Sequence, residues 1–378
     1  MTDTYTLYGS YASYYTAKVR SYLRKKGIPF VERLPSDPMF RNKVRPASGS
    51  HRIPQLLTPD GVVIQDSVEI VDFLETRFPE LPAFPEMPRQ RIFVHLMELL
   101  GSEGLVRLAW LHRWMFEEND SFVKMDFGRS FRPQGSDEEL RKYGDLIADK
   151  MKSYGLPEST GDARQALDEK YCRLLELFEA RLVEHPYFLG GQPSAADYAV
   201  MGAMHAHLGR DPAGLRLMQD HAPRTFRWVE HMIVPEVQSP EFFNRPVEYL
   251  PNDEVPETSL EILRFIADEY GRQFVFGSLA FNQAMARLGV DSGYELAPDQ
   301  DQPVLPAEKV RYDDVDGEHQ ANLHAVWLSQ RAQKWFQTQT AETQSHIANL
   351  LGPGELKDLL CVPLKFEIQR INNRLVIV

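Results

Sequence analysis

Four prolines at three-residue intervals constrain this chain most: Pro79, Pro82, Pro85 and Pro88. Such a segment is stiff and extended, so it indicates a linker between two differently built regions. Before it, short alternating segments are interleaved with helical ones. After it, the pattern stays helical over long stretches. Because 378 residues usually make two or three domains, the linker is expected to mark the first domain boundary.

The region before the linker predicts a mixed sheet with helices. Ser13 is a good N-cap and Gly27 a good C′ residue for a helix between them. Pro59-Asp60-Gly61 is typical of a hairpin turn. The predicted strands are 4–8, 30–34, 55–58 and 62–65, the predicted helices are 14–26 and 66–78, and residues 35–52 are expected to be irregular. This order predicts an α/β domain with four strands.

The region after the linker predicts helices at 89–118, 161–184 and 194–209. Ser194 and Asp197 have capping-box spacing at the start of the third. A second break falls at 246–256. Beyond it, 258–288 and 317–337 are expected to be helical around a stretch rich in Pro and Asp at 298–306, and 365–378 to form a hairpin turning at Asn372-Asn373.

Charge and cysteine content exclude several classes of function. The net charge of -12 argues against nucleic acid and anionic membranes as partners. The two cysteines, Cys172 and Cys361, lie far apart and make no disulfide framework or metal cluster. Residues 1–10 do not resemble a signal peptide, and no run of 18 apolar residues predicts a membrane span. We therefore expect a cytoplasmic protein without a metal.

Four motifs in order resemble the cytosolic glutathione transferase superfamily. They are the LYGS strand end with the Ser13-x-Tyr15-x-x-Lys18-Val19-Arg20 helix start, Arg52-Ile53-Pro54-Gln55-Leu56, Asp66-Ser67 followed by Ile70 and Leu74, and Gly191 to Asp197. The resemblance spans residues 4–210. It implies a thioredoxin-like glutathione-binding domain at 1–80, an all-helical domain at 89–250 and a homodimer, with glutathione as co-substrate. Residues 251–378 would be a mostly helical extension, as in some longer bacterial members, to which no role is assigned.

The resemblance places Ser13 at the catalytic position of the serine-type members. Glutathione's thiol titrates near 8.5, and lowering its pKa by about two units requires roughly 2.7 kcal/mol of anion stabilisation. A hydroxyl donor and a helix N-terminus can supply this together. The alternative is that Ser13 is only an N-cap. Other classes use a tyrosine late in the first strand, so Tyr8 is a second candidate donor, or else a packed strand residue.

Five further residues are expected to hold the tripeptide. The resemblance implies a cis-proline at Pro54, which would aim the backbone of Ile53 at the cysteinyl part of glutathione. Arg52 would meet the glycyl carboxylate, unless it is simply exposed. Ser67 would bind the γ-glutamyl carboxylate at a helix N-terminus, and Asp66 would bind the ammonium. An Asp/Ser helix cap is the alternative at these two positions.

The second substrate is less well defined by the sequence. Tyr14, Trp110 and Trp114 are candidates for an apolar pocket, although side chains at such spacing are often plain core. The leading interpretation is transfer of glutathione to a hydrophobic electrophile. Its rivals are a non-catalytic binding or scaffold protein of the same fold, and a glutathione-dependent lyase, isomerase or peroxidase.

Overall fold

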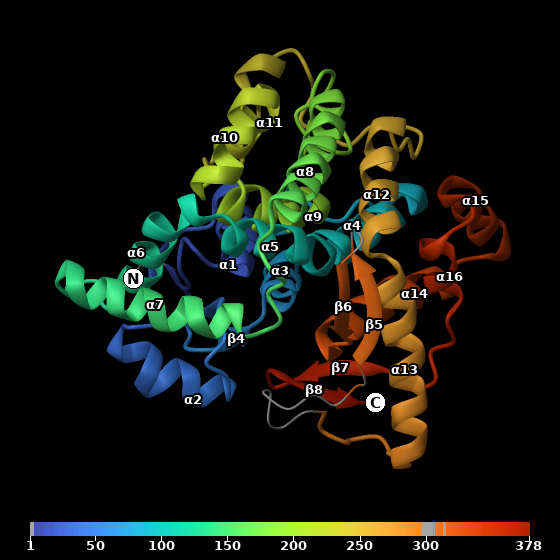
Figure 1. Ribbon diagram of the computed structural model, residues 1–378. Coiled ribbons are helices and arrows are strands. Elements are labelled where there is room, and N and C mark those ends of the chain that lie inside the picture. Colours follow the sequence, from blue (N-terminus) through green and yellow to red (C-terminus); the bar gives the residue numbers. More distant parts are fainter. Residues whose placement is uncertain (1–3, 297–304, 306, 313–314) are drawn as a thin grey trace.

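The computed structural model describes residues 4–296, 305, 307–312 and 315–378 (Figure 1). The sheet region at the N-terminus has the predicted mixed sheet, with strand order β2-β1-β3-β4. Strand β1 runs parallel to β2 and antiparallel to β3, and β3 and β4 form a hairpin. Its elements are β1 (Tyr5–Tyr8), α1 (Tyr14–Lys25), β2 (Phe30–Arg33), η1 (Phe40–Val44), α2 (Arg45–Ser48), β3 (Gln55–Leu57), β4 (Val63–Gln65) and α3 (Ser67–Glu75).

The two faces of this sheet are covered differently. Leu7, Leu56 and Ile64 are cross-strand neighbours and belong to the main core together with the apolar side chains of α1 and α3. Because successive strand residues point to opposite faces, Tyr8, Leu57 and Val63 lie on the other face. There they pack with Phe40 and Val44 of the short helix η1. The segment 35–52, expected to be irregular, therefore contains two short helices that cover this face.

The helical region that follows begins at Pro88, the last proline of the linker. In Figure 1 it extends from the centre of the molecule to the top and to the left. The elements are α4 (Pro88–Leu99), η2 (Leu100–Gly104), α5 (Leu105–Met115), η3 (Glu117–Asn119), α6 (Asp120–Phe131), α7 (Asp137–Lys152), α8 (Gly161–Arg181), α9 (Ala195–Met201), η4 (Gly202–His207), α10 (Pro212–His221), α11 (Pro223–Met232) and η5 (Pro240–Phe242).

Two local features of this region follow from its sequence. The predicted capping box is confirmed, since the buried Asp197 carboxylate accepts from Ser194 N–H at 2.8 Å and from Phe188 N–H at 3.0 Å. Helices α6 and α7 cross at two glycines. A Cβ at Gly128 would lie 2.1 Å from the Leu140 carbonyl oxygen, and one at Gly144 would lie 2.1 Å from that of Lys124. Only residues without a side chain allow these backbones to come so close.

The extension is mostly helical, as predicted, with two added hairpins. Its elements are α12 (Glu257–Tyr270), α13 (Arg272–Leu288), β5 (Ala307–Tyr312), β6 (Val315–Gln320), α14 (Leu323–Gln337), α15 (Ala341–Leu351), α16 (Glu355–Cys361), β7 (Ile368–Ile371) and β8 (Arg374–Ile377). The helix predicted for 317–337 is wrong at its start, because β6 pairs with β5 and Asn322 caps α14. Of the Pro/Asp-rich stretch 298–306, all but Leu305 lie outside the described residues.

The predicted terminal hairpin is confirmed. Strands β7 and β8 are antiparallel, and the turn residues Asn372 and Asn373 have φ values of 51° and 66°. Both angles are left-handed, as the tightest hairpin turns require, and asparagine tolerates this region better than most residues. The sequence signal at these two positions was therefore sufficient to locate the turn.

The extension lies against both other regions (Figure 1). Helix α14 packs on α4, and α12 packs on α8. The turn of the C-terminal hairpin reaches the edge strand β4. There the Asn373 side chain accepts from Gln65 N–H at 2.8 Å and donates to the Val63 carbonyl oxygen at 3.1 Å. These bonds cover polar main-chain groups on the outer edge of the sheet, which would otherwise face solvent.

Candidate functional site

The sheet brings the predicted site residues to one end. Tyr8 at the end of β1 pairs with Gln55 at the start of β3, which pairs with Gln65 at the end of β4. Ser13 follows the first of these strands, Pro54 precedes the second and Asp66 follows the third. The last two are joined directly, because Asp66 N–H donates to the Pro54 carbonyl oxygen at 3.3 Å.

Ser13 caps helix α1 and keeps its hydroxyl proton available. Its Oγ accepts a hydrogen bond from Thr16 N–H at 3.3 Å, and no acidic residue stands in the first turn of the helix. Within the described part of the chain, no acceptor is bonded to the Ser13 hydroxyl. The partial positive charge of a helix N-terminus favours a nearby anion. Ser13 can therefore cap the helix and donate to an anion at the same time.

The phenols near Ser13 are buried. Tyr8 is 1% exposed, its ring lies 5.4 Å from that of Phe40, and burial raises its pKa. Tyr14 is also buried, and its hydroxyl donates to the Gly101 carbonyl oxygen at 2.5 Å. Burial, reinforced by Glu103, raises the pKa of Tyr14 well above its ordinary value. Both phenols stay protonated at neutral pH, and the Tyr14 proton is already in use.

The turn before β3 is stabilised by hydrogen bonds from a buried side chain. The buried Gln55 side chain donates to the carbonyl oxygens of Ser50 and Arg52, at 2.8 and 2.9 Å. The Ile53–Pro54 peptide bond is cis. Ile53 is half-buried against the cluster around Tyr8, and Arg52 is exposed. Among the described contacts, the main-chain N–H and C=O of Ile53 make no hydrogen bond, so both can pair with an extended peptide.

Asp66 lies where the sheet region meets the extension. It is the N-cap of α3, at a φ of 95°, and its Oδ1 accepts from Val68 N–H at 2.8 Å and from Glu69 N–H at 3.5 Å. Its Oδ2 lies 2.8 Å from His324 Nε2 and 3.4 Å from Arg370 Nη2. Burial alone would raise the pKa of Asp66, but the two cations outweigh it and hold this pKa well below its usual range.

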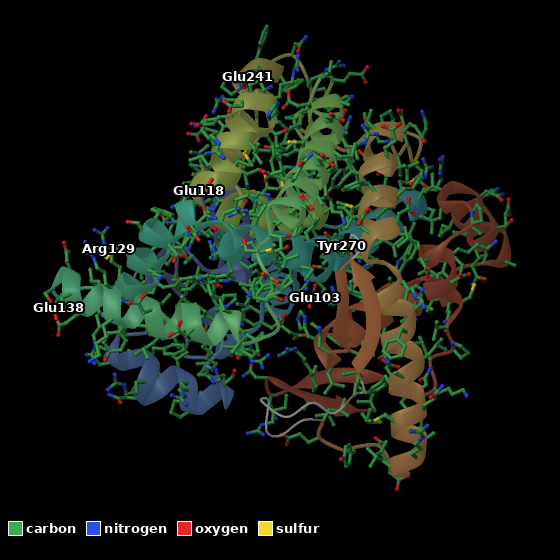
Figure 2. The ribbon with its side chains drawn as sticks, in the orientation of Figure 1. Glu103, Glu118, Arg129, Glu138, Glu241 and Tyr270 are labelled. Carbon is green, nitrogen blue, oxygen red and sulfur yellow. The ribbon has the colours of Figure 1, made fainter. Side chains whose placement is uncertain are left out.

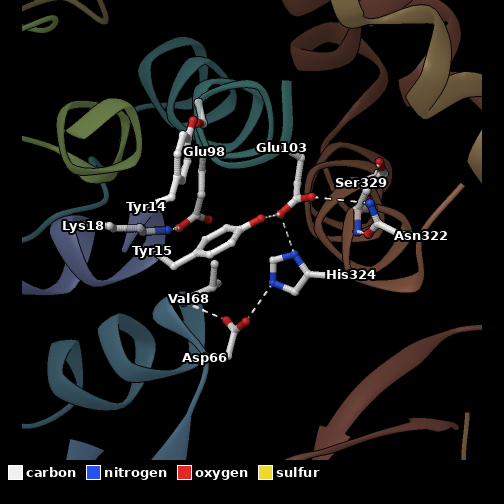
Figure 3. A network of polar contacts seen from close by, with 12 residues as sticks. Tyr14, Tyr15, Lys18, Asp66, Val68, Glu98, Glu103, Asn322, His324 and Ser329 are labelled. Carbon is white, nitrogen blue, oxygen red and sulfur yellow. Dashed lines mark hydrogen bonds and ion pairs between the residues drawn. The ribbon is translucent and has the colours of Figure 1, made fainter. Parts of the chain in front are cut away.

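His324 links two buried carboxylates (Figure 3). While its Nε2 contacts Asp66, its Nδ1 lies 2.8 Å from Glu103 Oε1, and Glu103 also accepts from the Tyr15 hydroxyl at 3.0 Å. Burial lowers the pKa of His324, but attraction to Asp66 and Glu103 prevails and raises it to about 9. The imidazolium thus ties α3 to η2 and, through Tyr15, to the first turn of α1. Figure 2 shows Glu103 on the side of the helical region that faces the extension.

A second ionic link runs parallel to the first. Lys18 of α1 lies 2.7 Å from Glu98 of α4, and both side chains are 2% exposed. Arg331 of α14 lies 3.5 Å from the same Glu98 and binds the Asp72 carboxylate of α3 at 2.5 and 3.0 Å. The extension therefore supplies three cations, His324, Arg331 and Arg370, to the acidic side of the other two regions.

The three candidate residues for a second substrate have different surroundings. Tyr14, the first residue of α1, packs against Gly202 and His207 of η4. Trp114 is 4% exposed and its ring stacks 5.9 Å from that of Phe127 in the small core formed with α6 and α7. Trp110 is half-buried, with the Arg107 guanidinium 5.1 Å from its ring centre. Of the three, Trp110 is the one with appreciable exposed surface.

Two other kinds of feature are absent from the described residues. They contain no group of three or more His, Cys, Asp or Glu side chains placed to hold a metal ion. None of the helices described is long and apolar enough to cross a membrane.

Two family models match the chain. "Glutathione S-transferase, N-terminal domain" matches residues 7–82, and "Glutathione S-transferase, C-terminal domain" matches residues 145–234. No curated protein sequence matches.

Solved structures resemble part of the chain. A glutathione S-transferase from Methylobacterium radiotolerans, in complex with glutathione sulfonate, is 20% identical over 67% of this chain and 100% of its own, with a TM-score of 0.37. Glutathione transferase GSTFuA3 from Phanerochaete chrysosporium is 17% identical over 62% and 98%, with a TM-score of 0.46. The beta-etherase LigF from Sphingobium is 20% identical over 60% and 94%, with a TM-score of 0.41.

Proposed function

Because this chain belongs to the glutathione transferase superfamily, we propose that it binds glutathione and transfers its thiolate to a hydrophobic electrophile. The single observation that carries the proposal is the state of Ser13. Its Oγ accepts the capping hydrogen bond from Thr16 N–H, and its proton stays available at the N-terminus of α1. Both features favour a sulfur anion placed beside it.

The other end of the tripeptide would extend along the sheet. The cysteinyl backbone pairs with the unoccupied N–H and C=O of Ile53, next to the cis bond to Pro54. Arg52 is exposed within reach of the glycyl end. The γ-glutamyl end lies at the start of α3, beside Asp66 and Ser67. In this proposal the thiol lies between Ser13 and Ile53.

The chemical step is a nucleophilic attack. The ionised sulfur forms a bond to an electrophilic carbon, and the electron pair leaves with a departing anion or goes to a neighbouring atom that then takes up a proton. Ser13 lowers the thiol's pKa so that a larger fraction is ionised before attack. We propose that Trp110 contributes to the apolar surface for the electrophile, with Tyr14 and Trp114 supporting it from the core.

A binding and turnover experiment tests this function. Calorimetry with glutathione, followed by a panel of electrophiles, should give binding and turnover in the wild type. Ser13→Ala should retain binding and lose about 10- to 1000-fold in turnover, as when one donor to a reacting anion is removed. Ser10→Ala is the matched control, because Ser10 is a buried serine in the same loop.

Each other result has a defined meaning. If glutathione binds and no electrophile is turned over, the chain is a binding or scaffold protein. If turnover survives Ser13→Ala and is lost in Tyr8→Phe, the donor is Tyr8. If glutathione does not bind to the folded chain, the proposal is wrong.

We also propose that the protein is a cytoplasmic homodimer, as the family resemblance implies. Sedimentation of the full chain would test the dimer. A monomer at micromolar concentration would contradict it.

A further inference from the structure

We propose that Arg370, on the C-terminal hairpin, is a specificity-determining residue of the glutathione site and binds the carboxylate of the γ-glutamyl group. The inference rests on the proposed function and adds a residue that lies outside both matched family models. It also assigns a role to part of the extension: to complete the end of the site where α3 begins.

Arg370 is fixed at that end of the site. Its Nη1 donates to the Gln65 side chain at 2.8 Å, and its Nη2 lies 3.4 Å from Asp66 Oδ2. The Trp327 ring lies 5.1 Å from the guanidinium, and the Arg370 side chain is only 9% exposed. A guanidinium held by its neighbours loses little freedom when it binds a carboxylate.

The Asp66 carboxylate is already occupied. Its two oxygens face four groups: the N–H of Val68 and of Glu69, the His324 imidazolium and the Arg370 guanidinium. An ionised carboxylate offers about four lone-pair sites. An incoming ammonium would have to displace His324, which also compensates the buried Glu103. Asp66 therefore positions His324 and Arg370 through its ion pairs, and its oxygens have no free acceptor site for an ammonium.

Unused donors, in contrast, are present beside it. In the part of the chain that the structure describes, the buried Nε of Arg370 and the buried Oγ of Ser67 have no hydrogen-bond partner. The Ser67 main-chain N–H is also at the first position of α3, where no intrahelical partner exists. Buried polar groups normally find a partner. A carboxylate supplies acceptors for these donors, and an ammonium does not.

The nearby acidic residue does not cancel this preference. Glu69 lies one turn into α3, and burial, with the charge of Asp72, raises its pKa to about 7. At neutral pH it is therefore only partly ionised, while Arg370, Arg331 and His324 all carry positive charge. The remaining attraction at this end of the site favours the α-carboxylate of the γ-glutamyl group over its ammonium.

Two analogues of glutathione separate these contributions without changing the protein. Glutaryl-cysteinylglycine keeps the carboxylate and lacks the ammonium. 4-Aminobutanoyl-cysteinylglycine keeps the ammonium and lacks the carboxylate. In calorimetric titrations of the full wild-type chain, we expect the first to bind within about 3-fold of glutathione. The second should bind about 10- to 100-fold more weakly, as for the loss of a hydrogen bond to a charged group.

A substitution then assigns the effect to one side chain. Arg370→Gln should weaken glutathione binding, and it should reduce the difference between glutathione and the 4-aminobutanoyl analogue to the part that the Ser67 donors supply, because the two losses share the Arg370 interaction. Arg370→Lys should give an intermediate loss, since it keeps the charge without the fork. Arg374→Gln is the matched control, because it lies on the same hairpin and pairs with Glu295; its binding should be unchanged.

Three results would overturn the inference. One is wild-type protein that binds the glutaryl analogue poorly and the aminobutanoyl analogue well. The second is an Arg370→Gln variant that discriminates between glutathione and the aminobutanoyl analogue as strongly as the wild type does. The third is an equal loss in Arg374→Gln, which would indicate general disturbance of the hairpin. Wild type that fails to bind glutathione at all would instead overturn the proposed function, and this inference with it.

Discussion

The sheet region meets its two neighbours in different ways. Against the helical region it buries rings and close backbone: the Tyr14 ring fills the space over Gly202, and the Tyr22 and Tyr198 rings are 5.3 Å apart. Against the extension it presents the carboxylates of Asp66 and Asp72. His324 and Arg370 of the extension pair with Asp66, and Arg331 pairs with Asp72. Glu98 belongs to both contacts, since Lys18 and Arg331 share it.

This difference indicates how each contact responds to pH and salt. An apolar contact responds little to pH or salt, and the contact with the helical region is apolar except at groups such as the buried Lys18–Glu98 pair. A contact built on buried ion pairs depends on the charge of each partner, and such pairs are strongly destabilised when one partner is lost. We therefore expect the extension to be the part of the molecule whose attachment varies with conditions. Four predictions test this, in order of decreasing effect.

Lys18→Met should have the largest effect, because it weakens both contacts. It leaves Glu98, 1% exposed, with the longer Arg331 pair alone. We expect the free energy of unfolding in urea to fall by about 3–5 kcal/mol. Lys43→Met, at an exposed lysine of η1, should change it little. Equally small changes in the free energy of unfolding of Lys18→Met and Lys43→Met would show that the Lys18–Glu98 pair does not stabilise the fold.

Raising the pH should weaken the extension's contact through His324. The pKa of His324 is about 9 in the folded chain and about 6.5 when unfolded, so its stabilisation is complete below about 6.5 and lost as the pH rises through 9. Protonated His324 contributes on the order of 3 kcal/mol to the free energy of unfolding. Between about pH 6 and pH 10, hydrogen exchange of the β7–β8 amides should accelerate by more than the pH-dependent increase of their intrinsic exchange rate.

The control for this pH effect is a pair of histidine variants. His324→Gln should remove the additional acceleration, and His346→Gln on α15 should keep it. Acceleration that persists in His324→Gln would assign the pH dependence to another group.

Gly202→Ala should damage the apolar contact and leave the extension's pH dependence intact. A Cβ at this position would lie 2.3 Å from the Tyr14 ring. We expect a loss of about 2 kcal/mol from overpacking. Gly161→Ala, where a Cβ would meet nothing within 4 Å, should be neutral or slightly stabilising. A neutral Gly202→Ala would mean that the Tyr14 ring can move aside.

Asn373→Gly should have the smallest effect. It keeps the left-handed turn and removes the two side-chain hydrogen bonds to the edge of β4. We expect about 1–2 kcal/mol less protection of the β7–β8 amides. Asn372→Gly keeps the same turn without touching β4, so a similar loss in that variant would place the effect in the turn itself.

Local signals account for what the sequence predicted well. The N-cap at Ser13, the hairpin at Asn372-Asn373 and the capping box at Ser194 each depend on a few neighbouring residues, and the structure contains all three. The mixed sheet followed from strand and turn signals of the same kind. The start of α14 was missed because β6 is defined by its pairing with β5, which a helical periodicity does not report.

The ionic part of the site had no local signal. Arg370 and Asp66 are 304 positions apart, and nothing around either residue indicates the other. The family resemblance ends near residue 210, so it offered no counterpart for the extension. His324 and Arg370 become visible only when the folded chain places them beside the residues that the motifs had already identified.

The pKa of bound glutathione's thiol tests the central claim most directly. It can be measured by following thiolate absorbance against pH in the full-length protein and in Ser13→Ala. Wild type should give a value about two units below 8.5, and the variant should return to about 8.5 while still binding glutathione. A bound thiol that titrates near 8.5 in both proteins would contradict the role given to Ser13.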